Sequence, residues 1–181
     1  MRIVAGKWKG RPLKSPSWEG LRPTSDRLRE TLFNILAPSI AGARVLDGYA
    51  GTGAIGIEAL SRGAAHVTFV EREPRAVKLI DANLAALGAA GLNERAIIRA
   101  DIMSAAGRLG GEPFDLIIVD PPYGHDAAAQ ALAAVSPLAG AATRVIVEHG
   151  SRFAAPPAVD GLQLRRTVTA GDSALSFYER T

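Results

Sequence analysis

A glycine-rich turn within residues 44–56 constrains the fold of this chain more than any other feature. A short apolar strand ends at Asp47, and a helix with apolar residues begins at Ala54. The turn between them has the G-x-G-x-x-G spacing, with Gly51, Gly53 and Gly56. This spacing lets backbone N–H groups approach a ligand at a helix N-terminus. A glycine turn that only packs the helix against the strand is the alternative.

The carboxylate of Asp47 indicates which ligand such a turn would hold. In a dinucleotide site the turn binds a pyrophosphate, and an acid four residues before Gly51 would repel that anion. S-adenosylmethionine carries an ammonium and a sulfonium, while its own carboxylate can accept hydrogen bonds from the turn. The sequence therefore favours S-adenosylmethionine, with Asp47, Gly51 and Gly53 as contacts. A nicotinamide dinucleotide is the weakest alternative.

Strands and helices alternate after this turn, a pattern typical of a mainly parallel sheet with helices on both faces. Strands are expected at 67–70, 96–99, 114–119 and 144–148, and helices at about 74–87 and 127–135, with a short helix through Met103 and Leu109. Residues 162–169 and 173–179 alternate apolar and polar side chains with no helix between them. They predict an antiparallel hairpin. The length of 181 residues suits one α/β domain, residues 44–181, with an N-terminal appendage, residues 1–43.

Basic charge is concentrated in the N-terminal part of the chain. Residues 1–44 hold nine Lys and Arg against three Asp and Glu, and the remainder holds twelve against fifteen. This asymmetry favours a polyanionic partner such as nucleic acid, although a solvated charged face is the alternative. With no cysteine and only three scattered histidines, we expect no metal. Lacking a long apolar run or a signal-peptide core, the protein is expected in the cytoplasm, away from membranes.

The N-terminal appendage contains the candidate RNA contacts. Lys7, Lys9 and Arg11 alternate with Trp8 in a stretch that reads as a small hairpin or arm, so their charges are expected to bind phosphates. Trp8 either stacks on a base or packs against the domain. A helix follows, with start signals before residue 26 and Pro38 as its expected end. Two more cations near its start, Arg22 and Arg27, complete the predicted RNA-binding set, unless they serve only solubility.

Acidic residues end two further strands. Glu71 lies 18 residues after Gly53, close to the spacing at which an acid reaches ribose hydroxyls. Asp101 ends the next strand and could accept from an adenine amino group, with Ile102 packing on the ring. Each of these acids alone could equally be a helix cap or a solvated side chain. Together with Asp47 they suit the three parts of one adenosyl ligand.

The residues from Asp120 to Tyr123 read Asp-Pro-Pro-Tyr and carry the most specific chemical signal. An exocyclic base amine is a poor nucleophile, because its lone pair is delocalised into the ring. The Asp120 carboxylate and the Pro121 carbonyl can accept hydrogen bonds from its two N–H groups, and the prolines fix the backbone that holds these acceptors. Tyr123 offers a face for stacking on the base. A Pro-Pro loop that merely follows a buried strand is the alternative.

These motifs together closely resemble the RsmD family of bacterial methyltransferases, which act on the 2-amino group of a guanine in 16S ribosomal RNA. The resemblance covers nearly the whole chain. It rests on Arg22-Pro23-Thr24, Asp26-Arg27, Arg29 to Asn34, Leu46 to Gly53, Gly56 to Ala64, and Asp120 to Tyr123. It implies a Rossmann-like class I S-adenosylmethionine-dependent methyltransferase fold, with a mainly parallel seven-stranded sheet whose last strand is antiparallel.

The resemblance also implies a substrate, which is 16S rRNA presented by a small-subunit assembly intermediate. We expect the protein to act as a monomer. Two other functions stay open on the sequence. Asp-Pro-Pro-Tyr also suits the 6-amino group of adenine in RNA or DNA, and a ribosome-assembly factor could keep the cofactor pocket without turnover.

Overall fold

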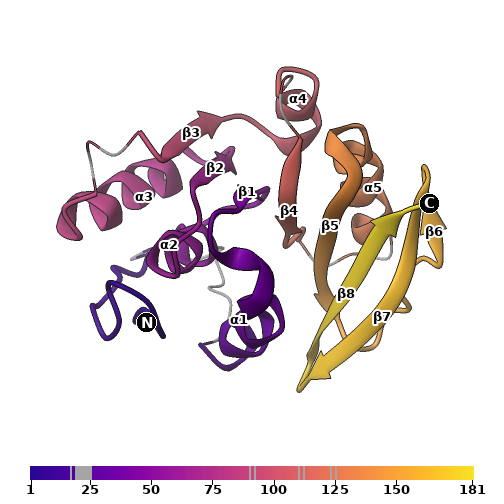
Figure 1. The fold of residues 1–181 in the computed structure, drawn as a ribbon, viewed down its shortest axis with the longest axis horizontal. Helices are drawn as coiled ribbons and strands as arrows, with labels where there is room; N and C mark the ends of the chain where they lie inside the picture. Colours follow the sequence, from indigo (N-terminus) through magenta and orange to yellow (C-terminus); the bar gives the residue numbers. More distant parts are fainter. Residues whose placement is uncertain are drawn as a thin grey trace.

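The computed structural model describes residues 1–16, 18, 26–89, 91, 93–109, 111, 113–122, 124 and 126–181. Its eight-stranded sheet has the order β3-β2-β1-β4-β5-β8-β7-β6 (Figure 1). The strands are β1 Arg44–Asp47, β2 His66–Glu71, β3 Arg95–Arg99, β4 Phe114–Val119, β5 Ala139–Gly150, β6 Ala158–Val159, β7 Leu162–Ala170 and β8 Ser173–Arg180. The helices are α1 Asp26–Ile40, α2 Ala54–Ser61, α3 Pro74–Ala86, α4 Ile102–Ala106 and α5 Ala127–Val135, with the 3-10 turn η1 Ser136–Leu138.

The pairing of the strands confirms the predicted mainly parallel sheet with a C-terminal antiparallel hairpin. Strands β3, β2, β1, β4 and β5 pair in parallel, whereas β8 runs antiparallel to both β5 and β7. The expected number of seven strands was one too few, because β6 adds two residues at the edge beside β7. So short a strand, placed between Pro157 and the Asp160-Gly161 turn, has no alternation to detect in the sequence.

Strand β5 is longer than the five residues predicted from its apolar run. It begins at Ala139, and its register with β4 shifts between the pairs Phe114–Ala139 and Leu116–Arg144. The buried Thr143 closes this irregularity, since its hydroxyl donates to the Phe114 carbonyl and accepts from Gly140 N at 2.8 Å. The start of β5 is therefore set by a side-chain contact with β4 rather than by its own Ala- and Gly-rich residues.

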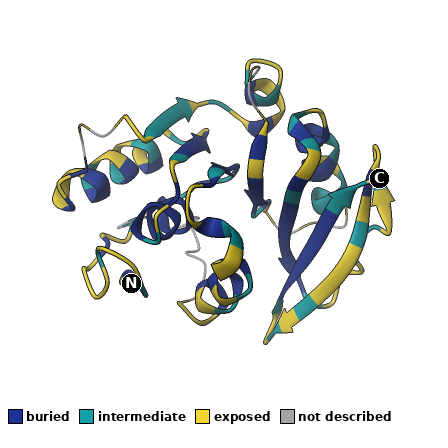
Figure 2. Ribbon diagram, in the orientation of Figure 1, coloured by how far each residue is buried: buried dark blue, intermediate teal, exposed yellow. Residues whose placement is uncertain are grey.

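Two hydrophobic clusters lie on opposite faces of the sheet. Figure 2 shows that β4 and β5 in the middle of the sheet are mostly buried, whereas β7 near its edge is mostly exposed. One contains residues of α1, α2 and α3, and the other contains residues of α4 and α5. Strand β4 alternates between them: Leu116 and Ile118 belong to the first cluster, and Ile117 and Val119 belong to the second. Its continuous apolar run is thus explained by burial on both faces.

Helix α1 does not end at Pro38, as the sequence predicted, but continues to Ile40. Proline removes one N–H from the helix ladder, and near the C-terminus of a helix this loss does not prevent the last residues from staying helical. The chain turns instead at Gly42, whose φ of +78° favours glycine. Gly42 N donates to the Gly63 carbonyl at 2.8 Å, which joins this turn to the end of α2.

Gly56 sets how closely α2 approaches β2. A Cβ atom at this position would lie 2.2 Å from Phe69 Cε1 and 2.8 Å from Val67 Cγ1. We expect Gly56→Ala to lower the free energy of unfolding by about 1–3 kcal/mol, measured by urea denaturation. The matched control is Gly107→Ala, because nothing lies within 4 Å of that Cβ position and its φ is −66°. Equal losses in the two variants would contradict this reading of the packing.

Candidate active site

Three acidic side chains meet at the carboxyl ends of neighbouring parallel strands. Asp47 ends β1, Glu71 ends β2, and Asp120 directly follows β4. Asp47 and Glu71 are buried, and Asp120 is half-buried. The charges of Asp120 and Glu71 are close enough to act on the pKa of Asp47. The structure therefore brings together three of the acids that the sequence singled out, at the edge where open α/β sheets bind ligands.

Asp47 is the most perturbed of these acids. Its side chain is 2% exposed, and its Oδ2 accepts a hydrogen bond from Gly56 N at 2.9 Å. Burial raises the pKa of Asp47 to about 7, and the charges of Asp120 and Glu71 add to this, while the Gly56 N–H opposes it. A buried carboxyl group of this kind gains from a cationic ligand, which would favour its charged form.

The pKa of Asp47 predicts how stability depends on pH. Between the usual pKa of 3.8 and about 7, folded Asp47 holds a proton that the unfolded chain has released. Its contribution to stability is therefore greatest below pH 3.8 and is lost as pH rises to about 7. The neutral variant Asp47→Asn should gain about 3 kcal/mol relative to wild type between pH 5 and 8, measured by denaturant titration. A difference that does not change with pH would contradict the raised pKa.

Glu71 holds the glycine turn in place. Its Oε2 accepts from Gly51 N at 2.8 Å, and its Oε1 accepts from Glu73 N at 2.7 Å. Gly51 and Gly53 have φ angles of +55° and +78°, which glycine adopts without strain. Each oxygen of Glu71 keeps a second lone pair for a ligand hydroxyl. Glu71 thus ties the turn to the start of α3 and still faces the same edge of the sheet.

Asp101 caps α4, which is the alternative that the sequence left open for it. Its carboxylate accepts from Ser104 N at 2.9 Å and from the Ser104 hydroxyl at 2.7 Å. These two hydrogen bonds hold the pKa of Asp101 below its usual value. Ile102 is buried at 2% exposure, and its Cδ1 would lie 3.3 Å from a Cβ on Gly48. Both residues therefore lie beside the glycine turn, with the Asp101 side chain exposed.

A backbone hydrogen bond joins the glycine turn to β4, the strand that leads into the Asp-Pro-Pro segment. Gly48 N donates to the Ile118 carbonyl at 2.8 Å, two residues before Asp120. A side chain at Gly48 would lie 2.7 Å from Val119 Cγ1, so only glycine permits this close approach. Pro121 is buried. Tyr123, the predicted stacking residue, lies outside the described residues.

The predicted RNA contacts differ in their surroundings. Lys9 and Arg27 are exposed. Lys7 lies 3.9 Å from Glu94 and 4.4 Å from the centre of the half-buried Trp8 ring, which packs against the first core cluster. Arg11 is exposed and donates to the Ala86 carbonyl at 2.7 Å. Arg22 lies outside the described residues.

The sequence did not single out Glu58, which anchors the N-terminal segment. It is 1% exposed within α2 and accepts from Val4 N at 2.8 Å and Ala5 N at 2.9 Å. Arg62 donates to it at 2.8 Å, and Arg29 lies 3.8 Å away. An acid in an otherwise apolar helix was the available signal. Its partners in the N-terminal segment, Val4 and Ala5, lie more than 50 residues away in the sequence. Local patterns therefore could not identify them.

Asn83 is a second residue that the sequence did not single out. It lies on α3 at 1% exposure, and its Oδ1 accepts from Lys14 N at 2.8 Å. Its amide donates to the Thr52 carbonyl at 3.1 Å and to the Lys14 carbonyl at 3.3 Å. One amide side chain thus connects the end of the N-terminal segment with the glycine turn.

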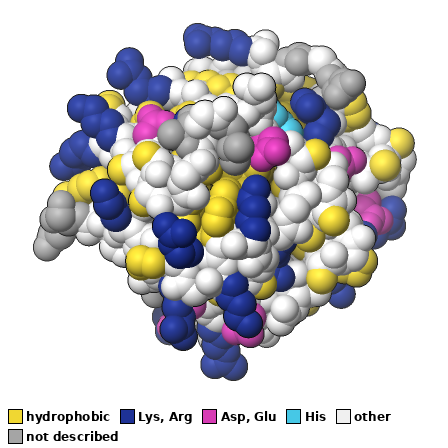
Figure 3. Space-filling model, turned by 60° about the vertical axis from the view of Figure 1, so that its left-hand side comes forward, with side chains coloured by type: hydrophobic (Ala, Val, Ile, Leu, Met, Phe, Trp, Pro, Cys, Tyr) yellow, Lys and Arg dark blue, Asp and Glu magenta, His cyan; other side chains and the backbone are white. Residues whose placement is uncertain are grey.

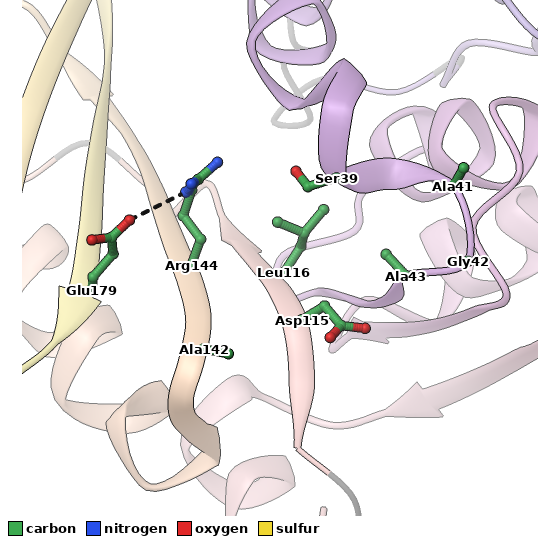
Figure 4. Close-up of a pocket in the computed structure, with 9 residues that line it drawn as sticks. All are labelled: Ser39, Ala41, Gly42, Ala43, Asp115, Leu116, Ala142, Arg144 and Glu179. Atoms are coloured by element: carbon green, nitrogen blue, oxygen red, sulfur yellow. Dashed lines mark ion pairs between the residues drawn. The ribbon is translucent and has the colours of Figure 1, made fainter.

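A pocket of about 330 Å³ lies at the opposite edge of the sheet, near the amino ends of β1 and β4 (Figure 4). Its charged residues are already engaged: Asp115 accepts from Arg44 N at 2.7 Å, and Arg144 lies 3.6 Å from Glu179. It contains none of the predicted site residues. Among the described residues, no group of three His, Asp or Glu side chains could hold a metal, and no helix is long and apolar enough to cross a membrane.

The sheet order, the glycine turn after β1 and the Asp-Pro-Pro segment after β4 define a class I methyltransferase fold. The chain belongs to the family described as "Conserved hypothetical protein 95", which matches residues 1–179. This confirms the resemblance to the RsmD family.

Individual relatives agree with this assignment. The Escherichia coli K12 protein "Ribosomal RNA small subunit methyltransferase D" is 37% identical over 182 residues, covering 99% of this chain and 90% of that protein. The Bacillus subtilis "Putative rRNA methyltransferase YlbH" is 34% identical over 187 residues, covering 99% of both. The solved "Putative methyltransferase yhhF from Escherichia coli" has a TM-score of 0.86 at 34% identity, covering 99% of this chain and 97% of that one.

Proposed function

We propose that this protein methylates the exocyclic 2-amino group of a guanine in 16S ribosomal RNA, with S-adenosylmethionine as the methyl donor. The observation that carries the proposal is the hydrogen bond between Gly48 N and the Ile118 carbonyl. This contact between the start of the glycine turn and β4 supports a site in which the cofactor at the turn and an amine at Asp120 lie side by side. The rRNA methyltransferases among its relatives support the substrate class.

The residues at the strand ends fit S-adenosylmethionine. Asp47 is a buried carboxyl group suited to a cation, Glu71 has lone pairs for ribose hydroxyls, and Asp101 is an exposed acceptor beside Ile102. Gly51 and Gly53 leave the approach to the turn free of side chains. Bound here, the cofactor would supply an electrophilic methyl group. The chain's own contribution is to bind it in a site where three acids favour positive charge.

The Asp-Pro-Pro segment acts on the nucleophile. The Asp120 carboxylate and the Pro121 carbonyl accept hydrogen bonds from the two N–H groups of the guanine amine. These hydrogen bonds favour a pyramidal nitrogen, whose lone pair is less delocalised into the ring. Pro121 and Pro122 limit the backbone to a narrow range of φ, so these acceptors are held before the base arrives. Holding the amine in line with the methyl group accounts for most of the expected acceleration. Tyr123 stacks on the base.

The N-terminal segment binds the RNA. Lys7, Lys9 and Arg11, with Arg22 and Arg27, contact phosphates, while Trp8 lies beside them. This appendage of residues 1–43 serves the methyltransferase domain of residues 44–181. The protein acts in the cytoplasm as a monomer, on a small-subunit assembly intermediate.

A methyl-transfer assay tests this function. Small subunits from cells that lack the protein are incubated with labelled S-adenosylmethionine, and the RNA is digested to nucleosides. Labelled 2-methylguanosine is the expected product. Labelled 6-methyladenosine would instead support an adenine methyltransferase. No label despite intact cofactor binding would contradict the proposal and favour a non-catalytic assembly factor.

A further inference from the structure

We propose that a groove between the N-terminal segment and the start of α1 binds one unpaired nucleotide of the RNA, separate from the target base. This inference rests on the proposed function and adds a second RNA subsite to it. The groove has a volume of about 480 Å³ and is lined by three cations, two acids and the apolar residues 3–4. The charged lining residues are Arg2, Lys9, Arg27, Asp26 and Glu30.

The charges that remain available in this groove are mainly positive. Asp26 already accepts from the Arg29 guanidinium at 2.9 Å. Arg2, Lys9 and Arg27 form no side-chain ion pair within the described part of the chain, and all three are exposed. Figure 3 turns the N-terminal side of the molecule forward and shows Lys and Arg side chains more widely spread than acidic ones. The groove therefore complements an anion, and Glu30 is its one acid without a described partner.

The two walls of the groove are tied together by a buried side chain. Arg29 is fully buried, and its Nη2 donates both to the Arg2 carbonyl on one wall and to Asp26 on the other. Glu58 holds the backbone N–H of Val4 at 2.8 Å. The spacing between the walls is thus fixed before a ligand binds. Because the site is already formed, binding costs little conformational entropy.

The tip of the segment that carries Lys9 is also held. Ile3 N donates to the Arg11 carbonyl at 3.0 Å, and Gly10 N donates to the Ile3 carbonyl at 2.9 Å. Lys9 N donates to the Gly6 carbonyl at 3.1 Å. These backbone bonds form a compact loop, and Lys9 on this loop lines the groove together with Arg27.

This chemistry fits a nucleotide whose base is unpaired. The three cations suit the phosphates on either side of it, and the Glu30 carboxylate can accept from a base amino group. Such an edge is free only in single-stranded RNA, where bases can leave the stack. The volume lies in the range of sites for single small ligands. The groove is therefore expected to prefer adenine or cytosine over uracil, which has no amino group.

Binding of short oligoribonucleotides tests the groove. Lys9→Gln with Arg27→Gln should weaken binding of a single-stranded hexamer about 10-fold and lower the slope of log K against log salt by about 1.4. The matched control is Lys78→Gln with Arg165→Gln, which removes two exposed cations outside the groove and should leave both values unchanged. Unfolding midpoints and cofactor Kd measured in parallel should not differ among the proteins.

Base preference gives a second readout. Wild type should bind oligo(A) and oligo(C) more tightly than oligo(U), and Glu30→Gln should reduce this preference. Equal effects of the groove and control pairs, or duplex binding as tight as single-strand binding, would overturn the proposal. Methylation of small subunits with unchanged KM in the groove variant would overturn it, together with the phosphate contacts of Lys9 and Arg27, while leaving the proposed methyl transfer intact. If binding depended on the groove but the protein methylated no ribosomal RNA, the groove proposal would stand and the proposed function would be overturned.

Discussion

Asp120→Ala is expected to slow methyl transfer about 10²–10³-fold, because it removes one of the two acceptors that hold the guanine amine. The single-turnover rate with saturating RNA and cofactor measures this step. Cofactor binding should survive, since the charge of Asp120 raises the pKa of Asp47 and its loss favours ionised Asp47. The variant is therefore expected to bind S-adenosylmethionine at least as tightly as wild type near pH 7.

Asp115→Ala is the matched control for this prediction. It removes an exposed carboxylate from the same strand, β4, at the opposite edge of the sheet. Its rate should stay close to that of wild type. A rate for Asp120→Ala within about twofold of that control would show that Asp120 does not hold the nucleophile. Loss of such an acceptor is expected to lower the rate by far more than twofold.

Glu58→Ala should destabilise the protein more than Gly56→Ala or Glu94→Ala, with a loss of about 3–5 kcal/mol in the free energy of unfolding. It removes the buried carboxylate beside the fully buried Arg29, which keeps only the exposed Asp26 as an ion partner, and it removes the acceptor of Val4 N and Ala5 N. Urea denaturation measures the loss. Limited proteolysis should also cut the N-terminal segment of Glu58→Ala well before the rest of the chain.

The exposed ion pair between Glu94 and Lys7, at 3.9 Å, supplies the comparison. Glu94→Ala should change stability by less than about 1 kcal/mol, because water screens such pairs. If Glu58→Ala were no more destabilising than Glu94→Ala, and its segment stayed protected, Glu58 could not be the anchor described above.

The sequence predicted those parts of the site that depend on local patterns. The run from Phe114 to Val119 matches β4 residue for residue, and the glycine spacing identified the turn before α2. Strand ends meet at one edge of a parallel sheet, so Asp47 and Glu71 could be placed together without coordinates.

Contacts between distant segments could not be predicted in this way. The roles of Glu58 and Asn83 depend on backbone groups 31 to 69 residues away. The start of β5 depends on Thr143 reaching the Phe114 carbonyl. Asn83 and Thr143 have an ordinary local sequence, and the apolar helix around Glu58 marks that acid without identifying its partners. Only the packing of the domain gives these residues their partners.

The predicted alternation of cations in the N-terminal segment was likewise incomplete. It treated Lys7, Lys9 and Arg11 as equivalent, whereas the structure gives Lys7 an acidic neighbour and gives Arg11 a carbonyl at the end of α3. Lys9 instead lines the groove with Arg27. Alternation shows which residues share a side of an extended segment, but the domain beside it decides what each one contacts.

Replacement of the target guanine by inosine tests the central claim most directly. Once nucleoside analysis has located the methylated guanine, small subunits are reconstituted with inosine at that position, which removes the 2-amino group and keeps the rest of the base. We predict that methyl transfer is lost while binding of the subunit is kept, because Asp120 and Pro121 then have no amine to hold. Undiminished methylation of the inosine subunits would contradict the account.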